Sequence, residues 1–284
     1  MNETDLDAVF NFNIGSMETL NDKKLFREIK KMDSKLSEIN LPTLFFGSHD
    51  MPRHYSRFSN LGNEEKIARL TSTFLLTAKG IPFLYFGEEI GMQDFIAKNI
   101  EEIKDVQGST AYHIAKESGY NDKEALKRAN KQNRDKSRTP MQWKNEKYFG
   151  FSKNEPWINC GDTSNDSIAD LQIRDDRSLW HHYQYLIQLR KNELTLQVGN
   201  YQMLNSENSI ISYERKFEQS SFMIILNFAD DDAEYNTRDL VEKEIEHVYS
   251  SQRFEMEEGS VLNSFRLLPY EAIVIKMNKG GPLA

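Results

Sequence analysis

The segment GSHDMPRHYSRF, residues 47–58, carries the side chains best suited to chemistry. It places His49, Asp50, Arg53 and Arg57 directly after an apolar run that is predicted to form a buried strand. A carboxylate beside imidazole and guanidinium groups stays ionised and can stabilise a developing positive charge. A His-Asp pair alone is more often explained by capping of a turn, with the arginines facing solvent, so this segment needs support from other motifs.

Two later segments contain further groups of interest. In FLYFGEEIGM, residues 83–92, Glu88 and Glu89 would point to opposite sides if the preceding strand continued. They are therefore predicted to be structural anchors and not a carboxylate pair acting across one bond. The segment RDKSRTPMQW, residues 134–143, is a basic loop followed by an aromatic residue. Such side chains can hydrogen-bond sugar hydroxyls and stack on a sugar ring, although an ordinary surface loop has the same composition.

No motif predicts a cofactor or a metal site. His181 and His182 are adjacent on a predicted helix and point about 100° apart, which disfavours a shared metal. The single Cys160 excludes an internal disulfide and a multi-thiolate metal site. The sequence contains no phosphate-binding glycine loop, no Ser-His-Asp arrangement and no compact acidic loop for calcium.

Composition limits the expected partners. The 284 residues carry a formal charge of -8 spread along the sequence, and no basic stripe is available for a phosphate backbone, so nucleic acid is not expected. No apolar run approaches the roughly 20 residues that cross a bilayer, and the start MNETDLDAVF lacks the pattern of a signal peptide. We therefore expect no membrane association and a cytoplasmic location.

Strands and helices alternate in the first part of the chain. Apolar runs predict strands at 8–14, 41–47 and 81–87, and amphipathic patterns predict helices at 21–39 and 64–79. Because these strands are apolar throughout and not on one face only, they indicate parallel βαβ units that are covered on both faces.

The pattern changes after residue 93. Residues 93–170 are polar, partly helical and rich in loops, as expected of an insertion that carries binding loops, and 175–192 predicts a strong helix. From 196 to 278 the apolar residues alternate, which predicts a separate antiparallel β domain, and 279–284 has the composition of a tail. The predicted fold class is α/β plus all-β.

Taken in order, these motifs resemble the α-amylase family of glycoside hydrolases, in particular its oligo-1,6-glucosidase, dextran glucosidase and trehalose-6-phosphate hydrolase branch. Three segments are similar to the sixth, seventh and eighth strands of the family's barrel: VFNFNI, FFGSHDMPRHYSRF and GIPFLYFGEEIGM. Three more are similar to an RDNxRTPMQW loop, its GF…PWI continuation and the closing helix: RDKSRTPMQW, FGFSKNEPWI and SLWHHYQYLIQLRK. The ordered set over nearly the whole chain is more specific than any one motif.

The resemblance implies a fold for each part of the chain. Residues 1–195 would form the last three strands and helices of a (β/α)8 TIM barrel, with the insertion at about 93–170, followed by an antiparallel β-sandwich at 196–278. In the family, two strands further upstream supply the nucleophilic Asp and the acid/base Glu. Neither of these two residues can be placed in this sequence.

The resemblance also implies roles for individual residues. Asp50 matches the third active-site carboxylate, which binds sugar hydroxyls and favours a distorted, cation-like ring, and His49 is its hydroxyl-binding neighbour. Arg138, with Arg134 as the alternative, matches the arginine that grips the non-reducing terminal glucose. Arg53 is a further candidate for substrate binding.

Two positions depart from the family's pattern. Ser48 stands where an Asn usually precedes the His-Asp pair, and Lys136 stands where the loop motif has the Asn of RDN. We expect the first to change a hydrogen bond beneath the sugar and the second to change the conformation of the loop.

The implied activity is retaining hydrolysis of terminal α-glucosidic bonds in oligosaccharides. One Asp cannot act as both nucleophile and acid, so the chain is expected to be a truncated portion that is inactive alone and needs a separate N-terminal half of the barrel or self-association. Two alternatives stay open: a non-catalytic carbohydrate-binding or regulatory remnant, and part of a trehalose synthase-like sugar transferase or isomerase. Linkage preference is not predicted, because in the family it is set largely by residues near the nucleophile and the acid.

Overall fold

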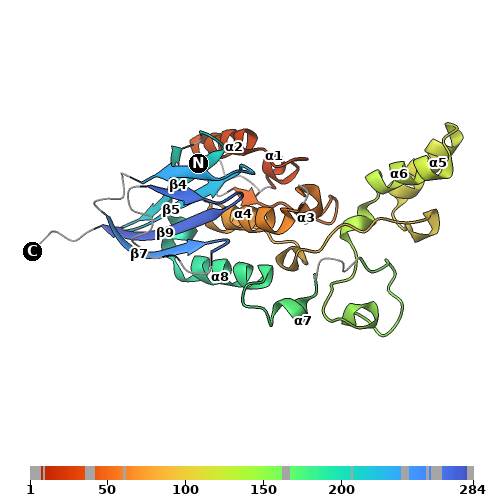
Figure 1. Ribbon diagram of the computed structural model, residues 1–284. Helices are drawn as coiled ribbons and strands as arrows, with labels where there is room; N and C mark the ends of the chain where they lie inside the picture. Colours follow the sequence, from red (N-terminus) through yellow and green to blue (C-terminus); the bar gives the residue numbers. More distant parts are fainter. Residues whose placement is uncertain are drawn as a thin grey trace, which may run out of the picture. The chain divides into compact units, whose positions relative to one another are not determined.

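The computed structural model divides the chain into two compact units (Figure 1). The described residues are 8, 10–35, 42–59, 62–161, 167–205, 207–237, 243–253, 256 and 264–279. The first unit draws on residues 1–45, 60–83 and 182–284, and the second draws on 46–59 and 84–181. The boundary predicted near residue 195 stays a prediction, because these units group residues by contact and not by folding domain.

The first unit contains a short parallel βαβ arrangement. β1 (Thr43–Leu44) and β2 (Ile81–Pro82) pair in parallel, and α4 (Glu64–Thr77) connects them along the chain. The last two turns of α4, from Leu70 to Thr77, are buried on all sides, as is typical of a helix inside a larger core. The predicted parallel unit is confirmed, although both strands are shorter than predicted.

The strand predicted at 8–14 is wrong, because none of its described residues lies in a strand and its C-terminal end is helical. α1 (Phe12–Gly15) is a short helix, because the Asn11 side chain accepts a hydrogen bond from the backbone N–H of Asn13 and starts a turn. A Cβ at position 15 would lie 2.3 Å from the Phe45 ring, so glycine allows this turn to pack closely. Residue 9 of the predicted strand lies outside the described residues.

The longer predicted helices are present. α2 (Asp22–Lys35), α4 and α8 (Leu179–Asn192) lie within the helices predicted at 21–39, 64–79 and 175–192. Residues 36–39 of the first prediction lie outside the described residues. α9 (Leu194–Val198) follows α8 and leads into the β sheet.

The alternating pattern after residue 196 forms antiparallel strands. The larger sheet has five strands in the order β3, β4, β5, β9, β7, and Figure 1 shows β4, β5, β9 and β7 side by side. Its strands are β3 (Asn200–Asn205), β4 (Ile210–Phe217), β5 (Ser220–Asn227), β7 (Lys243–Ser250) and β9 (Ala272–Lys279). A second sheet pairs β6 (Ala233–Asn236) with β8 (Ser264–Leu267).

Both sheets contribute to one apolar core. Ile225 of β5 and Ile275 of β9 are fully buried, and Tyr235 of β6 and Leu267 of β8 pack into the same cluster. Burying one isoleucine side chain contributes about 1.5–3 kcal/mol relative to leaving it exposed. The shared core therefore fixes the smaller sheet against the larger one.

The buried Arg215 and the partly buried Arg190 bind the carbonyl groups at the C-terminal end of α4. Arg190 Nη1 donates to the carbonyls of Leu76 and Ala78 at 2.9 and 3.1 Å, and Arg215 Nη1 donates to that of Thr77 at 2.7 Å. The last carbonyls of a helix have no intrahelical partner, so the guanidinium groups satisfy them. Burial lowers the pKa of both arginines to about 10, which leaves them charged at neutral pH.

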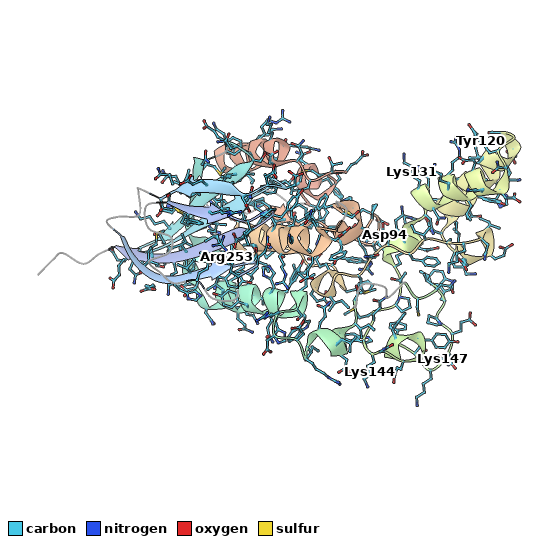
Figure 2. All side chains as sticks on the ribbon, viewed as in Figure 1. Asp94, Tyr120, Lys131, Lys144, Lys147 and Arg253 are labelled. Carbon is cyan, nitrogen blue, oxygen red and sulfur yellow. The ribbon has the colours of Figure 1, made fainter. Side chains whose placement is uncertain are left out.

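The second unit holds the predicted insertion. Its longest helices, α5 (Val106–Glu117) and α6 (Asp122–Gln132), pack against each other, with Tyr120 in the connection between them (Figure 2). Its shorter elements are α3 (His54–Arg57), α7 (Ala169–Gln172) and four 3-10 turns, η1 (Glu88–Ile90), η2 (Ile100–Glu102), η3 (Arg134–Ser137) and η4 (Lys147–Gly150). None of the helices that the structure describes is long and apolar enough to cross a membrane.

Candidate functional site

Asp50, in the loop before α3, is contacted by three basic side chains. Arg138 Nη2 lies 2.7 Å from Asp50 Oδ1, and Arg134 Nη1 lies 3.4 Å from the same oxygen. His49 Nε2 lies 3.1 Å from Asp50 Oδ2. The Asp50 side chain is 51% exposed, so a ligand can reach it. The structure therefore brings together four predicted site residues from two segments that are more than 80 residues apart in the sequence.

Arg138 is fixed by two hydrogen bonds to the His-Asp pair. Its Nε donates to the His49 carbonyl at 2.7 Å, and its Nη2 donates to Asp50. A guanidinium that uses two donors in one plane fixes the orientation of the carboxylate as well as its distance. The backbone N–H of Asp50 also donates to Ser48 Oγ at 3.3 Å, which further fixes the position of Asp50. Ser48, the first departure from the family's pattern, thus accepts a hydrogen bond within the loop.

Arg134 joins Asp50 to a second, buried carboxylate. Its Nη2 lies 2.6 Å from Asp105 Oδ1, and its backbone N–H donates to Asp105 Oδ2 at 3.0 Å. Burial of the Asp105 carboxyl would raise its pKa, but the hydrogen bonds from Arg134 outweigh burial and lower it. The same hydrogen bond raises the pKa of Arg134. Asp105 was not predicted, because it lies in a polar stretch with no motif of its own.

The turn η3, which contains Arg134 and directly precedes Arg138, is held by hydrogen bonds to neighbouring segments. Asp135 Oδ2 accepts hydrogen bonds from the backbone N–H groups of Lys104 and Asp105 at 2.7 and 2.8 Å. The side chain of Lys136, the second departure from the family's pattern, donates to the Lys131 carbonyl at 3.0 Å. The lysine therefore ties the end of α6 to the turn, and the arginines leave the turn from a fixed backbone.

Arg53 is buried and directed away from solvent. Its side chain is 3% exposed, and it donates from Nη1 to the Phe86 carbonyl at 2.7 Å and from Nη2 to the Ser137 carbonyl at 3.0 Å. Its backbone N–H donates to Asp94 Oδ1 at 2.7 Å. Burial lowers the pKa of Arg53. The structure thus places Arg53 as a link between segments, and its predicted contact with substrate stays a prediction.

A neutral histidine lies beneath the loop. His54 Nδ1 lies 3.7 Å from Glu88 Oε2, and both side chains are buried. Burial lowers the pKa of His54 to about 3, with a further contribution from Arg57, so His54 carries no charge at neutral pH. Arg57 Nη2 donates to the Phe46 carbonyl at 2.5 Å. These contacts stabilise the loop, and a direct role in chemistry is not required to explain them.

Glu88 and Glu89 do not continue a strand. Gly87, with φ of 85°, ends the extended chain in a conformation that favours glycine, and η1 begins at Glu88. The premise that the two carboxylates alternate across a strand is therefore wrong. Burial raises the pKa of the Glu89 carboxyl.

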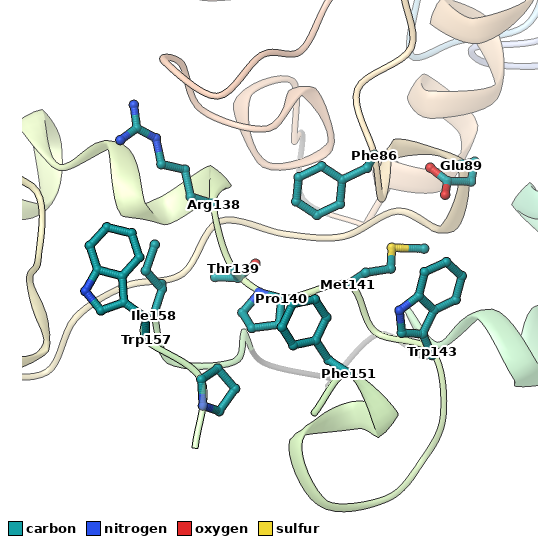
Figure 3. A pocket seen from close by; sticks show the side chains of 11 residues that line it. Phe86, Glu89, Arg138, Thr139, Pro140, Met141, Trp143, Phe151, Trp157 and Ile158 are labelled. Carbon is teal, nitrogen blue, oxygen red and sulfur yellow. The ribbon is translucent and has the colours of Figure 1, made fainter. Parts of the chain in front are cut away.

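A cavity of about 430 Å³ lies in the same unit (Figure 3). Its walls are mostly apolar and aromatic, and Arg138 belongs both to them and to the Asp50 cluster. The lining residues are Phe86, Glu89, Arg138, Thr139, Pro140, Met141, Trp143, Phe151, Pro156, Trp157 and Ile158. Among the described residues, no three His, Cys, Asp or Glu side chains are grouped to hold a metal ion.

Comparison with known proteins identifies the family. Residues 2–199 match the family described as Alpha amylase, catalytic domain. This chain belongs to the α-amylase family. The α-amylase-family chain is 31% identical over 255 residues to an oligo-1,6-glucosidase of Halalkalibacterium halodurans, a match that covers 89% of this chain and 45% of that protein. It is 32% identical over 239 residues to a trehalose-6-phosphate hydrolase of Bacillus subtilis, which covers 83% of this chain and 42% of that protein.

The fold of this chain also matches part of the solved structures of TIM-barrel enzymes in this family. A trehalose-6-phosphate hydrolase of Bacillus licheniformis has a TM-score of 0.81 at 27% identity, over 96% of this chain and 52% of its own. An isomaltulose synthase of a Klebsiella species has a TM-score of 0.82 at 25% identity, over 96% of this chain and 51% of its own. The predicted family is confirmed, and the α-amylase-family chain spans about half the length of these relatives.

Proposed function

We propose that this α-amylase-family chain supplies Asp50 as the third carboxylate of a retaining α-glucosidase that cleaves terminal α-glucosidic bonds of oligosaccharides. The proposal rests on the half-exposed Asp50 carboxylate, held 2.7 Å from Arg138 Nη2 and beside His49. The sequence similarity of this chain to an oligo-1,6-glucosidase and to a trehalose-6-phosphate hydrolase also supports hydrolysis of glucosidic bonds.

Asp50 acts through its charge and not through covalent attack. As the bond to the leaving group breaks, positive charge develops on the sugar ring. A carboxylate that is already oriented by hydrogen bonds stabilises this charge without reorganising. Its oxygens also accept hydrogen bonds from sugar hydroxyls, while Arg138, His49 and Arg134 provide donors for the hydroxyls at the non-reducing end.

Retaining hydrolysis needs two further carboxyl groups about 5 Å apart. The acid joined most directly to the Asp50 cluster is Asp105, which is engaged by the Nε and Nη2 atoms of Arg134 and is buried. Asp105 is therefore neither free nor accessible enough to attack a sugar. We propose that the nucleophile and the acid/base are contributed by residues outside this sequence, and that the chain alone does not hydrolyse glucosides.

The proposed barrel is completed at an aromatic surface of the first unit. Phe10 and Phe12 are 53% and 58% exposed, and both rings pack edge-on against Phe45. Among the described residues, β1 and β2 pair with no further parallel strand, and clustered exposed aromatic side chains beside such a pair are typical of a surface that is buried by more protein. We expect further barrel strands to pack here, from a longer polypeptide, a separate N-terminal half or a second copy. Residues 1–195 then belong to the barrel and 196–278 to the β-sandwich domain.

A sugar isomerase is the second candidate function. The structural match to an isomaltulose synthase favours it, and the third carboxylate would have the same role there. The two functions differ in their products, since an isomerase returns a rearranged disaccharide and a hydrolase returns free glucose. A non-catalytic saccharide-binding remnant is the remaining alternative.

Complementation separates these functions. The chain is mixed or co-expressed with the N-terminal part of the Halalkalibacterium halodurans oligo-1,6-glucosidase that precedes the matched region, and cleavage of an aryl α-glucoside is followed. We expect cleavage with both parts and none with either part alone. Cleavage by the chain alone contradicts the proposal, and a stable complex that binds sugars without cleaving them favours the remnant. Product analysis with sucrose and isomaltose then separates hydrolase from isomerase.

A further inference from the structure

Two carboxylates contact the side chain of Arg134, and they hold it unequally. Arg134 Nη2 lies 2.6 Å from Asp105 Oδ1, whereas Arg134 Nη1 lies 3.4 Å from Asp50 Oδ1. Arg134 Nε also donates to Asp105, at 3.1 and 3.2 Å to the two carboxylate oxygens. Strong hydrogen bonds between ionised groups have N–O distances of about 2.7–2.9 Å. Arg134 is therefore bound tightly to Asp105 and only loosely to Asp50.

The carboxylate of Asp105 is itself fixed in place. Its side chain is 2% exposed, and Oδ2 accepts a hydrogen bond from the backbone N–H of Arg134 at 3.0 Å. The backbone N–H of Gln107 also hydrogen-bonds Asp105. In the opposite direction, the backbone N–H of Asp105 donates to the buried Asp135 carboxylate at 2.8 Å. Because the two segments are tied in both directions, the position of Asp105 determines where the Arg134 guanidinium lies.

An Arg134 side chain released from Asp105 would have Asp50 as its nearest carboxylate. Asp50 Oδ1 already accepts from Arg138 at 2.7 Å, and Oδ2 lies 3.1 Å from His49 Nε2. A guanidinium matches a carboxylate in bidentate geometry, so a released Arg134 would close the 3.4 Å gap and pair with Asp50. The Asp50 oxygens would then be occupied by a cation of the protein and not by hydroxyls of a ligand.

We propose that Asp105 is a positioning residue, which holds Arg134 back from Asp50 and so keeps the Asp50 carboxylate open to sugar hydroxyls. This inference rests on the proposed function, because it requires that Asp50 binds sugar. It gives a role to a buried acid that takes no part in the proposed chemistry. Arg134 Nη1 stays on the Asp50 side, where it can donate to a hydroxyl of the ligand.

The first test is the affinity of the full chain for methyl α-glucoside, measured by calorimetry. Asp105→Asn keeps the size of the side chain but removes the charge that holds Arg134, and it should weaken binding about tenfold. Arg134→Gln should weaken binding only about threefold, because one donor is lost. The double variant should bind as Arg134→Gln does, and hence more tightly than Asp105→Asn, since no arginine remains to occupy Asp50.

This recovery in the double variant separates positioning from a structural role. If Asp105 only stabilised the loop, removing Arg134 as well would add to the damage, and the double variant would bind no more tightly than Asp105→Asn. A crystal structure of Asp105→Asn should show Arg134 within about 3 Å of Asp50. Asp122→Asn, which removes an exposed carboxylate paired with Lys116, is the control and should leave the affinity unchanged.

A second test uses unaltered Asp105, so it does not depend on the folding of Asp105→Asn. The Nε–H proton of Arg134, observed by ¹⁵N NMR, should exchange with water at least about tenfold more slowly than that of Arg174, whose side chain is 71% exposed. Asp50→Asn should leave this exchange slow, because Asp105 and not Asp50 holds Arg134 Nε.

The outcomes distinguish this inference from the proposed function. If Asp50→Asn weakens binding but Asp105→Asn does not, Asp105 has no positioning role and the proposed function stands. The same holds if the double variant binds no more tightly than Asp105→Asn, or if the Nε–H protons of Arg134 and Arg174 exchange equally fast. If Asp50→Asn leaves the affinity unchanged, the proposed function is contradicted, and the role of Asp105 with it.

Discussion

Arg53 donates from its guanidinium to the carbonyl oxygen of Ser137, 84 residues later in the sequence, at 3.0 Å. Ser137 directly precedes Arg138, and Arg53 lies three residues after Asp50. One buried hydrogen bond therefore joins the segment that carries the carboxylate to the segment that carries its arginine. A second hydrogen bond from the Arg53 guanidinium, to the Phe86 carbonyl, joins both segments to Phe86, which lines the cavity.

Replacing Arg53 with Met should loosen both segments. The change removes the Arg53 donor from the carbonyl of Phe86 and leaves the carbonyl of Ser137 with the Tyr85 hydroxyl as its donor, which we expect to lower the free energy of unfolding by about 2 kcal/mol. Hydrogen exchange of the amides in 134–143 should become faster at the same time. Chemical denaturation and mass-spectrometric exchange measure the two effects. Lys127→Met, on the exposed side of α6, is the control, and equal behaviour of the two variants would refute the linking role.

Replacing Asp50 with Asn should affect binding far more than stability. The carboxylate is half exposed, so its ion pairs with Arg138 and Arg134 contribute at most about 1 kcal/mol to folding. Affinity for methyl α-glucoside should fall at least about tenfold, because a neutral amide binds sugar hydroxyls less strongly than a charged acceptor does. Calorimetry gives the affinity and denaturation gives the stability. Asp170→Asn, which removes an exposed ion pair with Arg174, should change neither the affinity nor the stability by more than the experimental error.

The stability of the first unit should depend on pH through His182. Burial lowers the pKa of His182 from 6.5 to about 3, and its ring contacts the Tyr249 hydroxyl at 2.5 Å and Ser72 Oγ at 3.0 Å. Between pH 6.5 and 3 the unfolded chain binds a proton that the folded chain does not, so stability falls as the pH is lowered through this window. His182 should contribute a slope of up to about 1.4 kcal/mol per pH unit.

The measurement is the free energy of unfolding from pH 7 to 4. His182→Gln should show a shallower dependence than the wild type, whereas replacement of His113, which is exposed on α5, should leave the slope unchanged. A slope that is the same in all three proteins would mean that His182 is not buried in its neutral form.

Arg215 should be essential for the stability of the β sheet and of α4. It is fully buried and donates to the carbonyls of Thr77 and Gly199. Arg215→Met keeps the length of the side chain but leaves both carbonyls unpaired, at an expected cost of about 3 kcal/mol. Lys216→Met, at the exposed next position of β4, should cost less than about 0.5 kcal/mol. Similar denaturation midpoints for the two variants would contradict this account.

Much of the site could be predicted because its residues belong to contiguous motifs. His49 and Asp50 share one segment, Arg134 and Arg138 share another, and the family resemblance assigned both segments to the binding of one sugar. The distances among them agree with that expectation. Asp105 could not be predicted, because its importance arises only when the chain folds Arg134 against it.

The less successful predictions have local causes. Phe10 and Phe12 alternate as in a strand, but Asn11 between them hydrogen-bonds the backbone of Asn13 and starts a helical turn. The third strand ends at Pro82 within the apolar run predicted at 81–87, and the left-handed backbone of Gly87 then starts the turn η1 that brings Glu89 to the cavity. Both cases depend on backbone conformation at one residue, which hydrophobic periodicity does not report.

Asp50 is proposed to be one carboxylate of an active site that it shares with residues outside this sequence. The most direct test of this proposal is the rate of aryl α-glucoside cleavage by the complemented pair of polypeptides, with and without Asp50→Asn, in complexes of equal stability. We predict a loss of about 10²- to 10³-fold on this substitution and no loss with Asp170→Asn. Cleavage at the same rate with Asp50→Asn would contradict the account.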